Sequence, residues 1–193
     1  MFGGEVMKLF IGCSASEYIP QKYFDDCKFF LEELFTKEHD LVFGACNKGL
    51  MGLTYEIARN NGSSVEGIYP EVYKNEAKEI DCDKRSVKTI PERTDMLIKE
   101  SDALIFLPGG RGTIYELITS IECRRAYEFV KPIIIYTSCG YFDKMLEFLE
   151  LTYDEDFASR KVKDCYYICS DAKDALDYID RYYGIESKKR VRK

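Results

Sequence analysis

A glycine-rich segment near the middle of the chain has the residue types to bind an anion beside a carboxylate. It follows the apolar run 103–107 and reads Pro108-Gly109-Gly110-Arg111-Gly112-Thr113-Ile114-Tyr115-Glu116. Three glycines within four residues allow positive φ angles and expose backbone N–H groups, and a helix that follows would add its positive N-terminus. The phosphate-binding loop predicted from this pattern consists of Gly109, Gly110, Arg111, Gly112 and Thr113.

Glu116 lies three residues after Thr113, which is the spacing of a helix capping box. In one interpretation Thr113 caps the following helix and Glu116 folds back onto that turn. In the other, the carboxylate faces a ligand held by the loop. The direction of the Glu116 side chain therefore decides between a structural and a catalytic role.

Short apolar runs alternate with segments of helical period along the chain. The expected strands are 8–13, 41–43, 65–69, 87–90, 103–107, 132–136 and 165–169. The expected helices are 21–35, 50–60, 92–99, 113–130, 142–151 and 172–183. This alternation is typical of an α/β fold: a doubly wound, Rossmann-like parallel sheet with helices on both faces. Ligands of such sheets bind at the carboxyl ends of the strands, where the glycine-rich loop falls.

The composition is that of an ordinary globular protein. With 193 residues, we expect one Rossmann-like domain over 1–187 and a basic, disordered tail over 188–193. The net charge of −6 argues against nucleic acid as the partner of the folded domain. No apolar run is long enough to cross a bilayer, and no leader pattern opens the chain. We expect no membrane association and a cytoplasmic location.

The eight cysteines do not have the spacing of a metal site. They include no CxxC pair, and the chain has a single histidine, His39, beside two acidic residues. We expect reduced, mostly buried thiols, and His39 as a solvated turn residue. No metal site and no cofactor are predicted, and no motif marks the Schiff-base lysine of a pyridoxal-phosphate decarboxylase.

Several motifs combine to give a resemblance to a known family. They are Gly12-Cys13-Ser14, Gly49-Leu50-Met51-Gly52, Arg93, Ser101-Asp102-Ala103, the 108–116 segment and Gly140-Tyr141-Phe142. Together, over about residues 7–183, they resemble the LOG (lonely-guy) family, whose members are often labelled lysine decarboxylases.

The resemblance implies a homodimeric, Rossmann-like enzyme that needs no cofactor. Such enzymes hydrolyse the N-glycosidic bond of a nucleoside 5′-monophosphate, either cytokinin riboside monophosphate or AMP, to the free base and ribose 5-phosphate. By position, Arg93 and Glu116 match the catalytic pair and the glycine-rich loop matches the phosphate site. The other substrate-binding positions that the resemblance implies are Gly12, Ser14, Gly49, Met51 and Gly52.

The chain departs from the family pattern at positions near the expected site. The usual Gly-Gly-Gly after the second strand is Gly44-Ala45-Cys46, and the usual Arg-Lys is Arg93-Thr94. Ile90-Pro91 replaces Met-His, and Tyr115-Glu116 replaces Glu-Glu. Two alternatives stay open. One is a nucleotide-binding or sensor protein without turnover, and the other is a nucleoside deoxyribosyltransferase, which acts on unphosphorylated nucleosides.

Overall fold

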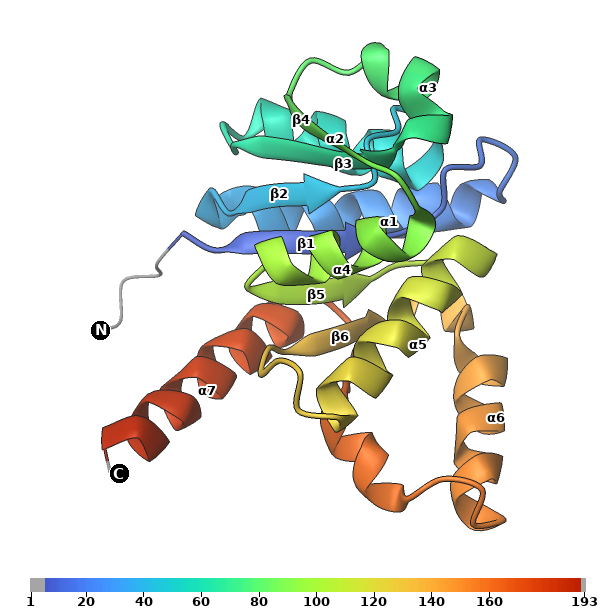
Figure 1. Cartoon of the computed structure of the whole chain (residues 1–193), viewed down its shortest axis with the longest axis vertical. Coiled ribbons are helices and arrows are strands. Elements are labelled where there is room, and N and C mark those ends of the chain that lie inside the picture. Colours follow the sequence, from blue (N-terminus) through green and yellow to red (C-terminus); the bar gives the residue numbers. More distant parts are fainter. Residues whose placement is uncertain (1–5, 192–193) are drawn as a thin grey trace.

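A computed structural model describes residues 6–191, which form one parallel sheet of seven strands with helices on both faces (Figure 1). The strand order is β4-β3-β2-β1-β5-β6-β7, and every strand pair is parallel. The strands are β1 (Lys8–Gly12), β2 (Asp40–Phe43), β3 (Val65–Pro70), β4 (Asp83–Val87), β5 (Ala103–Phe106), β6 (Ile133–Tyr136) and β7 (Tyr167–Cys169). The predicted fold class is confirmed.

The helices divide between two apolar layers, one on each face of the sheet. Helices α1 (Gln21–Leu34), α2 (Gly49–Asn60), α3 (Lys74–Lys78) and α7 (Ala172–Val191) contribute to one layer. Helices α4 (Ile90–Glu100), α5 (Arg111–Arg125) and α6 (Asp143–Asp154) lie on the opposite face. In Figure 1, α4 and α5 lie in front of the sheet, and α1 and α2 lie behind it.

Alternation along the central strands explains why both layers form. Leu9 and Ile11 of β1 join the layer with α1 and α2, whereas Phe10 joins the layer with α4 and α5. All four residues of β5 and all four of β6 are buried, as expected for strands covered on both faces. Burial of this apolar surface is the main force that holds the helices on the sheet.

The strand order places a topological switch between β1 and β5. From β1 the chain adds β2, β3 and β4 on one side, then returns through α4 to place β5 on the other side. Gly12 at the end of β1 is in register with Phe106 at the end of β5. The loops after these two strands therefore diverge from the point where doubly wound sheets bind ligands.

The fourth strand was misplaced by the sequence prediction. It spans Asp83–Val87 rather than 87–90, and Ile90 already begins α4. Thr89 caps that helix, because its hydroxyl accepts from the N–H of Glu92 while the Glu92 carboxylate accepts from the N–H of Thr89. As an exposed edge strand, β4 carries mostly polar residues, so a search for apolar runs missed it.

Two other expectations need correction. Helix α5 spans Arg111–Arg125 rather than 113–130. His39 is 1% exposed rather than solvated, and its Nδ1 accepts a hydrogen bond from the N–H of Met7. It lies one residue before β2, where the backbone is already entering the sheet.

The C-terminal helix is longer than predicted, and the cysteines are unpaired. Helix α7 continues to Val191 and so includes the first residues of the predicted basic tail, whereas residues 192–193 lie outside the described part. All eight cysteines are free thiols, and Cys13, Cys27 and Cys169 are buried. Within residues 6–191, no helix has the length and apolar character needed to span a membrane.

Candidate active site

Three loops at the carboxyl end of the sheet are joined by backbone hydrogen bonds. The N–H of Leu107 donates to the carbonyl of Gly12 at 2.9 Å, and the N–H of Ser14 donates to the carbonyl of Pro108 at 3.0 Å. The N–H of Met51 donates to the carbonyl of Ser14, also at 3.0 Å. The structure thus brings together three segments that are far apart in the sequence, and each carries predicted site residues.

Gly49 and Gly52 allow helix α2 to approach its neighbours closely. Gly49 has a φ of +60°, and a Cβ there would lie 2.6 Å from the Ser16 carbonyl oxygen. A Cβ on Gly52 would lie 2.2 Å from the carbonyl oxygen of Asn47. Both glycines are therefore required by packing at the first turn of α2, close to the loop after β1.

The first turn of α5 presents unsatisfied backbone donors. Gly110 is the N-cap of this helix, and no side chain caps it. The first hydrogen bond within the helix runs from the N–H of Ile114 to the carbonyl of Gly110. The N–H groups of Arg111, Gly112 and Thr113 precede that bond and have no acceptor within the helix. A Cβ built on Gly110 or Gly112 meets no atom within 4 Å, so this backbone is open to a ligand.

The glycines of this loop do not act through positive φ, contrary to the prediction. Among the described glycines, positive φ occurs at Gly49, Gly62 and Gly140 but at none of the loop glycines. Gly109 is instead required by close packing, because its Cβ would lie 2.1 Å from Oγ1 of Thr113. Arg111 is exposed at the first position of α5, where its charge can reach an anion.

The predicted capping box at Thr113 is wrong. Thr113 is buried as the third residue of α5, and no side-chain cap is present at that end. The Glu116 carboxylate instead accepts a hydrogen bond from Nη2 of Arg93, which projects from α4. Only 13% of the Arg93 side chain and 8% of the Glu116 side chain are exposed. The structure thus places the two predicted catalytic residues in one buried ion pair.

The electrostatics of this pair are dominated by burial. Burial raises the pKa of the Glu116 carboxyl, and the neighbouring Arg93 charge opposes that rise. The Nε of Arg93 is buried without a hydrogen-bond partner, so the guanidinium has donor capacity to spare. Its Nη1 lies 3.7 Å from the position of a Cβ on Gly44, which places the loop after β2 beside the pair.

Thr94 and Cys13 are buried residues close to the pair. Thr94, which replaces the family's lysine, is fully buried and donates its hydroxyl to the Ile90 carbonyl at 3.2 Å. Cys13 lies at the end of β1, and burial raises the pKa of its thiol, so it is not a reactive thiolate. Within residues 6–191, no cluster of His, Cys, Asp and Glu side chains has an arrangement that could hold a metal ion.

Tyr141 is a site residue that reasoning from residue types did not single out. It follows β6, and its hydroxyl donates to the carbonyl of Gly109 at 2.7 Å. The sequence contained only an indirect signal, because Gly140-Tyr141-Phe142 was part of the family resemblance without a role of its own. The loops after β5 and β6 meet because these strands are neighbours in the sheet. Residue types alone do not predict that strand order.

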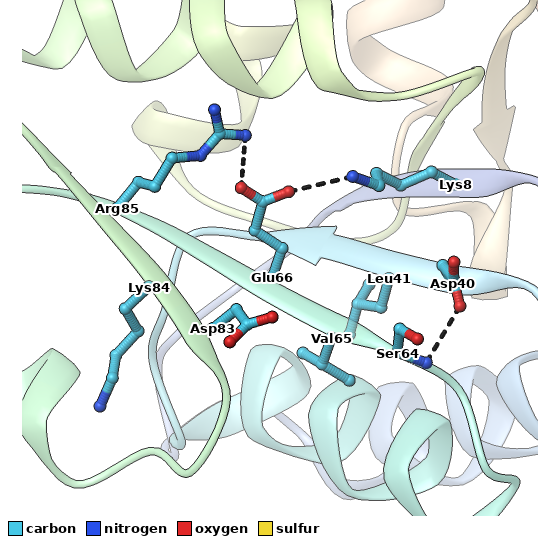
Figure 2. Close-up of a pocket in the computed structure, with 9 residues that line it drawn as sticks. All are labelled: Lys8, Asp40, Leu41, Ser64, Val65, Glu66, Asp83, Lys84 and Arg85. Carbon is cyan, nitrogen blue, oxygen red and sulfur yellow. Dashed lines mark hydrogen bonds and ion pairs between the residues drawn. The ribbon is translucent and has the colours of Figure 1, made fainter.

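A cavity of about 410 Å³ lies elsewhere, at the amino ends of β1 to β4 (Figure 2). Three of its charged side chains form an ion-pair network: Glu66 accepts from Lys8 at 3.1 Å and from Arg85, and Arg85 also pairs with Glu100. The Arg93–Glu116 pair lies at the carboxyl end of the sheet instead. The cavity is therefore remote from the candidate site.

Comparison with known proteins shows the family of this chain. The model of the family described as possible lysine decarboxylase matches residues 51–179. One cytokinin riboside 5′-monophosphate phosphoribohydrolase of Arabidopsis thaliana is 31% identical over 81% of this chain and 76% of its own length. Another from the same plant is 28% identical, over 91% of this chain and 82% of its own length.

Solved structures with the same fold are more distant in sequence. The molybdenum cofactor carrier protein of Chlamydomonas reinhardtii superposes with a TM-score of 0.68 at 13% identity, covering 93% of this chain and 99% of its own. The molybdenum cofactor binding protein of Rippkaea orientalis gives a TM-score of 0.64 at 16% identity, covering 92% and 97%. These similarities establish the fold. The activity has to be inferred from the site residues.

Proposed function

Because the chain belongs to the possible lysine decarboxylase family, also known as the LOG family, we propose that it is a nucleoside 5′-monophosphate phosphoribohydrolase. The reaction breaks the N-glycosidic bond with water and yields the free base and ribose 5-phosphate. The named phosphoribohydrolases among its relatives support a hydrolase acting on such bonds. The observation that carries the proposal is the buried Arg93–Glu116 pair beside the open first turn of α5.

The 5′-phosphate binds at the N-terminus of α5. The N–H groups of residues 111–113 point out of the helix and combine with its positive dipole, which favours an anion. The open backbone at Gly110 and Gly112 lets phosphate oxygens approach without steric hindrance. Arg111 adds positive charge at the same end. In this arrangement the phosphate fixes the ribose close to the carboxylate one turn deeper in the helix.

Glu116 acts on the anomeric carbon. Cleavage of a ribosyl C–N bond passes through a cation-like sugar, which a carboxylate stabilises directly or by orienting the attacking water. The water oxygen bonds to the anomeric carbon, the electrons of the C–N bond leave with the base, and a proton from water ends on the base. Arg93 holds the carboxylate in place by donating to it from Nη2.

The remaining predicted positions surround this centre. Gly12 and Ser14 lie at the end of β1, and Gly49, Met51 and Gly52 form the first turn of α2, which is hydrogen-bonded to Ser14. We assign them to the sugar and base side of the substrate, either cytokinin riboside monophosphate or AMP. The reaction uses water as nucleophile, so no cofactor is part of the proposal.

The direct test is base release from a nucleotide. The purified protein is incubated with AMP and with isopentenyladenosine 5′-monophosphate, and free base is measured by chromatography. Adenosine is the control, since binding through the phosphate predicts release from the nucleotides and little from the nucleoside. If a folded protein releases no base from any nucleoside monophosphate, the proposal is wrong.

A binding protein without turnover is the second candidate, favoured by the departures around the pair. Ala45, where the family has glycine, adopts a φ of +55°, and Thr94 is turned into the protein interior. Thr94 follows Arg93 in α4, and Ala45 follows Gly44, whose Cβ position would lie 3.7 Å from Nη1 of Arg93. Such changes could preserve the phosphate site while altering the catalytic centre. Calorimetric binding of AMP without any hydrolysis would favour this candidate over the enzyme.

We also propose a cytoplasmic homodimer, as the family resemblance implies. Helix α6 leaves Phe148 and Leu151 exposed, at 63% and 51%, which gives a second copy an apolar surface to cover. Sedimentation equilibrium measures the mass directly. A particle of the 22.4 kDa monomer mass at micromolar concentration would contradict the homodimer.

A further inference from the structure

The side chain of Tyr141 packs against two aromatic neighbours. Its ring packs edge-on against Tyr23 of α1, with centroids 5.4 Å apart, and against Phe142, with centroids 5.1 Å apart. These edge-to-face contacts leave the hydroxyl directed at one acceptor, the Gly109 carbonyl, at 2.7 Å. A tyrosine from the β6 loop therefore makes a specific bond to the loop after β5.

The turn that precedes Tyr141 is itself unusual. Cys139 and Gly140 have φ angles of +48° and +72°, so the chain makes two successive left-handed steps before the tyrosine. A Cβ on Gly140 would lie 2.7 Å from Oδ2 of Asp143, at the start of α6. The backbone conformation is thus well defined on the side from which Tyr141 reaches the glycine loop.

The acceptor is part of the peptide group that joins Gly109 to Gly110. No peptide bond in the described chain is cis, and in a trans peptide the C=O and N–H point in opposite directions. Holding the Gly109 oxygen toward Tyr141 therefore turns the N–H of Gly110 away from it. Because both flanking residues are glycines, this peptide plane could otherwise rotate at little steric cost.

We propose that Tyr141 is a positioning residue for the 5′-phosphate. By holding the Gly109 carbonyl, it keeps the N–H of Gly110 directed outward at the N-terminus of α5, where it joins the N–H groups of residues 111–113. A flipped peptide would direct a carbonyl oxygen at the phosphate and repel it. This inference rests on the proposed function, because it assigns the anion-binding loop to the substrate's phosphate.

The test is Tyr141→Phe, which keeps the ring contacts and removes only the hydroxyl. We expect the KM for AMP and the Ki of ribose 5-phosphate to rise together by about fivefold, as for one lost hydrogen bond. Adenine has no phosphate, so its Ki should stay at the wild-type value, and kcat at saturation should change less than twofold. Tyr23→Phe is the matched control, because it removes a hydroxyl from the adjacent ring without touching Gly109, and it should behave as wild type.

The outcomes separate the two proposals. Unchanged KM and unchanged ribose 5-phosphate inhibition in Tyr141→Phe would overturn the positioning role, even if hydrolysis of AMP is observed. Weaker binding of adenine by the same factor would also overturn it, since the tyrosine would then act on the base. If no nucleotide is hydrolysed, calorimetric titration with ribose 5-phosphate still tests Tyr141, and a weaker affinity of the variant supports it.

Discussion

In the Arg93–Glu116 ion pair, each residue neutralises the buried charge of the other. Both side chains are nearly buried, and removing one partner would leave the other as an uncompensated charge. The pair also joins α4 to α5, so the carboxylate is oriented by a residue from a different helix. A charge held in this way needs little reorganisation when positive charge develops on a nearby sugar, which is the property that catalysis requires.

Glu116→Gln should remove turnover while leaving phosphate binding intact. The amide keeps the size of the side chain but cannot stabilise a cationic sugar or activate water, so we expect kcat to fall by about 100-fold or more. The affinity for ribose 5-phosphate, measured by calorimetry, should stay within about twofold of wild type because the proposed phosphate site is formed mainly by the α5 backbone.

The control for this variant is Glu122→Gln on the same helix. Glu122 pairs with Arg125 at the surface, where 52% of its side chain is exposed, so its loss should leave both kcat and affinity unchanged. Full activity of Glu116→Gln would show that the carboxylate has no part in the chemistry.

The pH dependence of kcat/KM should report the raised pKa of Glu116. If the ionised carboxylate is the active form, the rate falls as pH decreases through its pKa. Burial raises this pKa, so the acid limb should lie above about 4.3, the ordinary value for glutamate. Arg93→Gln removes the charge that opposes the rise and should move the acid limb to still higher pH. An acid limb at or below the ordinary value would contradict the assignment.

At the scale of elements, the start of α5 depends on two glycines that have different roles. Gly109 packs directly against the side chain of Thr113, whereas Gly112 lies in the first turn with open space around it. The first is required by close packing before the helix, and the second leaves the helix backbone accessible. Replacement by alanine should therefore have opposite effects on stability at the two positions.

Gly109→Ala should destabilise the protein, and Gly112→Ala should not. The added methyl group at Gly109 would overlap Thr113 and force the loop to shift, with an expected loss of about 1–3 kcal/mol in the free energy of unfolding. At Gly112 alanine has the higher helix propensity, with an expected gain of up to about 1 kcal/mol. Urea unfolding of both variants measures the difference, and equal losses at the two sites would refute this account.

The sequence predicted those elements whose residues are buried on a regular period. Strands β5 and β6 are apolar throughout, and their predicted positions agree with the structure to within one residue at each end. Strand β4 lies at the exposed edge and is largely polar, so its residues carry no such signal. A capping box at Thr113 and Glu116 was one of two interpretations of the sequence, yet the structure has its capping box at Thr89 and Glu92. Capping motifs are short, and their identification depends on where the helix begins.

At the scale of the whole molecule, the candidate site is a product of topology. Arg93 and Glu116 were named from motifs, but their contact depends on α4 crossing the sheet to place β5 beside β1. The contact of Tyr141 with Gly109 likewise depends on β6 lying next to β5. Residue types and their spacing indicate which side chains of one segment could bind a ligand or take part in catalysis. Contacts between segments come from the strand order, and so the orientation of Glu116 could not be predicted.

The stability of the whole fold should fall in mild acid because of His39. This is the only histidine of the chain, and it is buried beside the entry to β2. Burial lowers its pKa, and the nearby Lys37 charge lowers it further, against the opposing effects of Asp180 and Asp40. The unfolded chain then binds the proton more tightly, so the free energy of unfolding should decrease as pH falls below about 6.5.

His39→Asn isolates this contribution. The asparagine Oδ1 can accept from the N–H of Met7 as Nδ1 does, but the side chain does not titrate. Other groups also contribute to the pH dependence of stability, among them Glu116, whose raised pKa makes stability fall as pH rises instead. These contributions cancel in the difference between variant and wild type. Urea unfolding from pH 5 to 8 should therefore show the variant's relative stability improving toward acid, and parallel curves would mean that His39 has no part in the pH dependence.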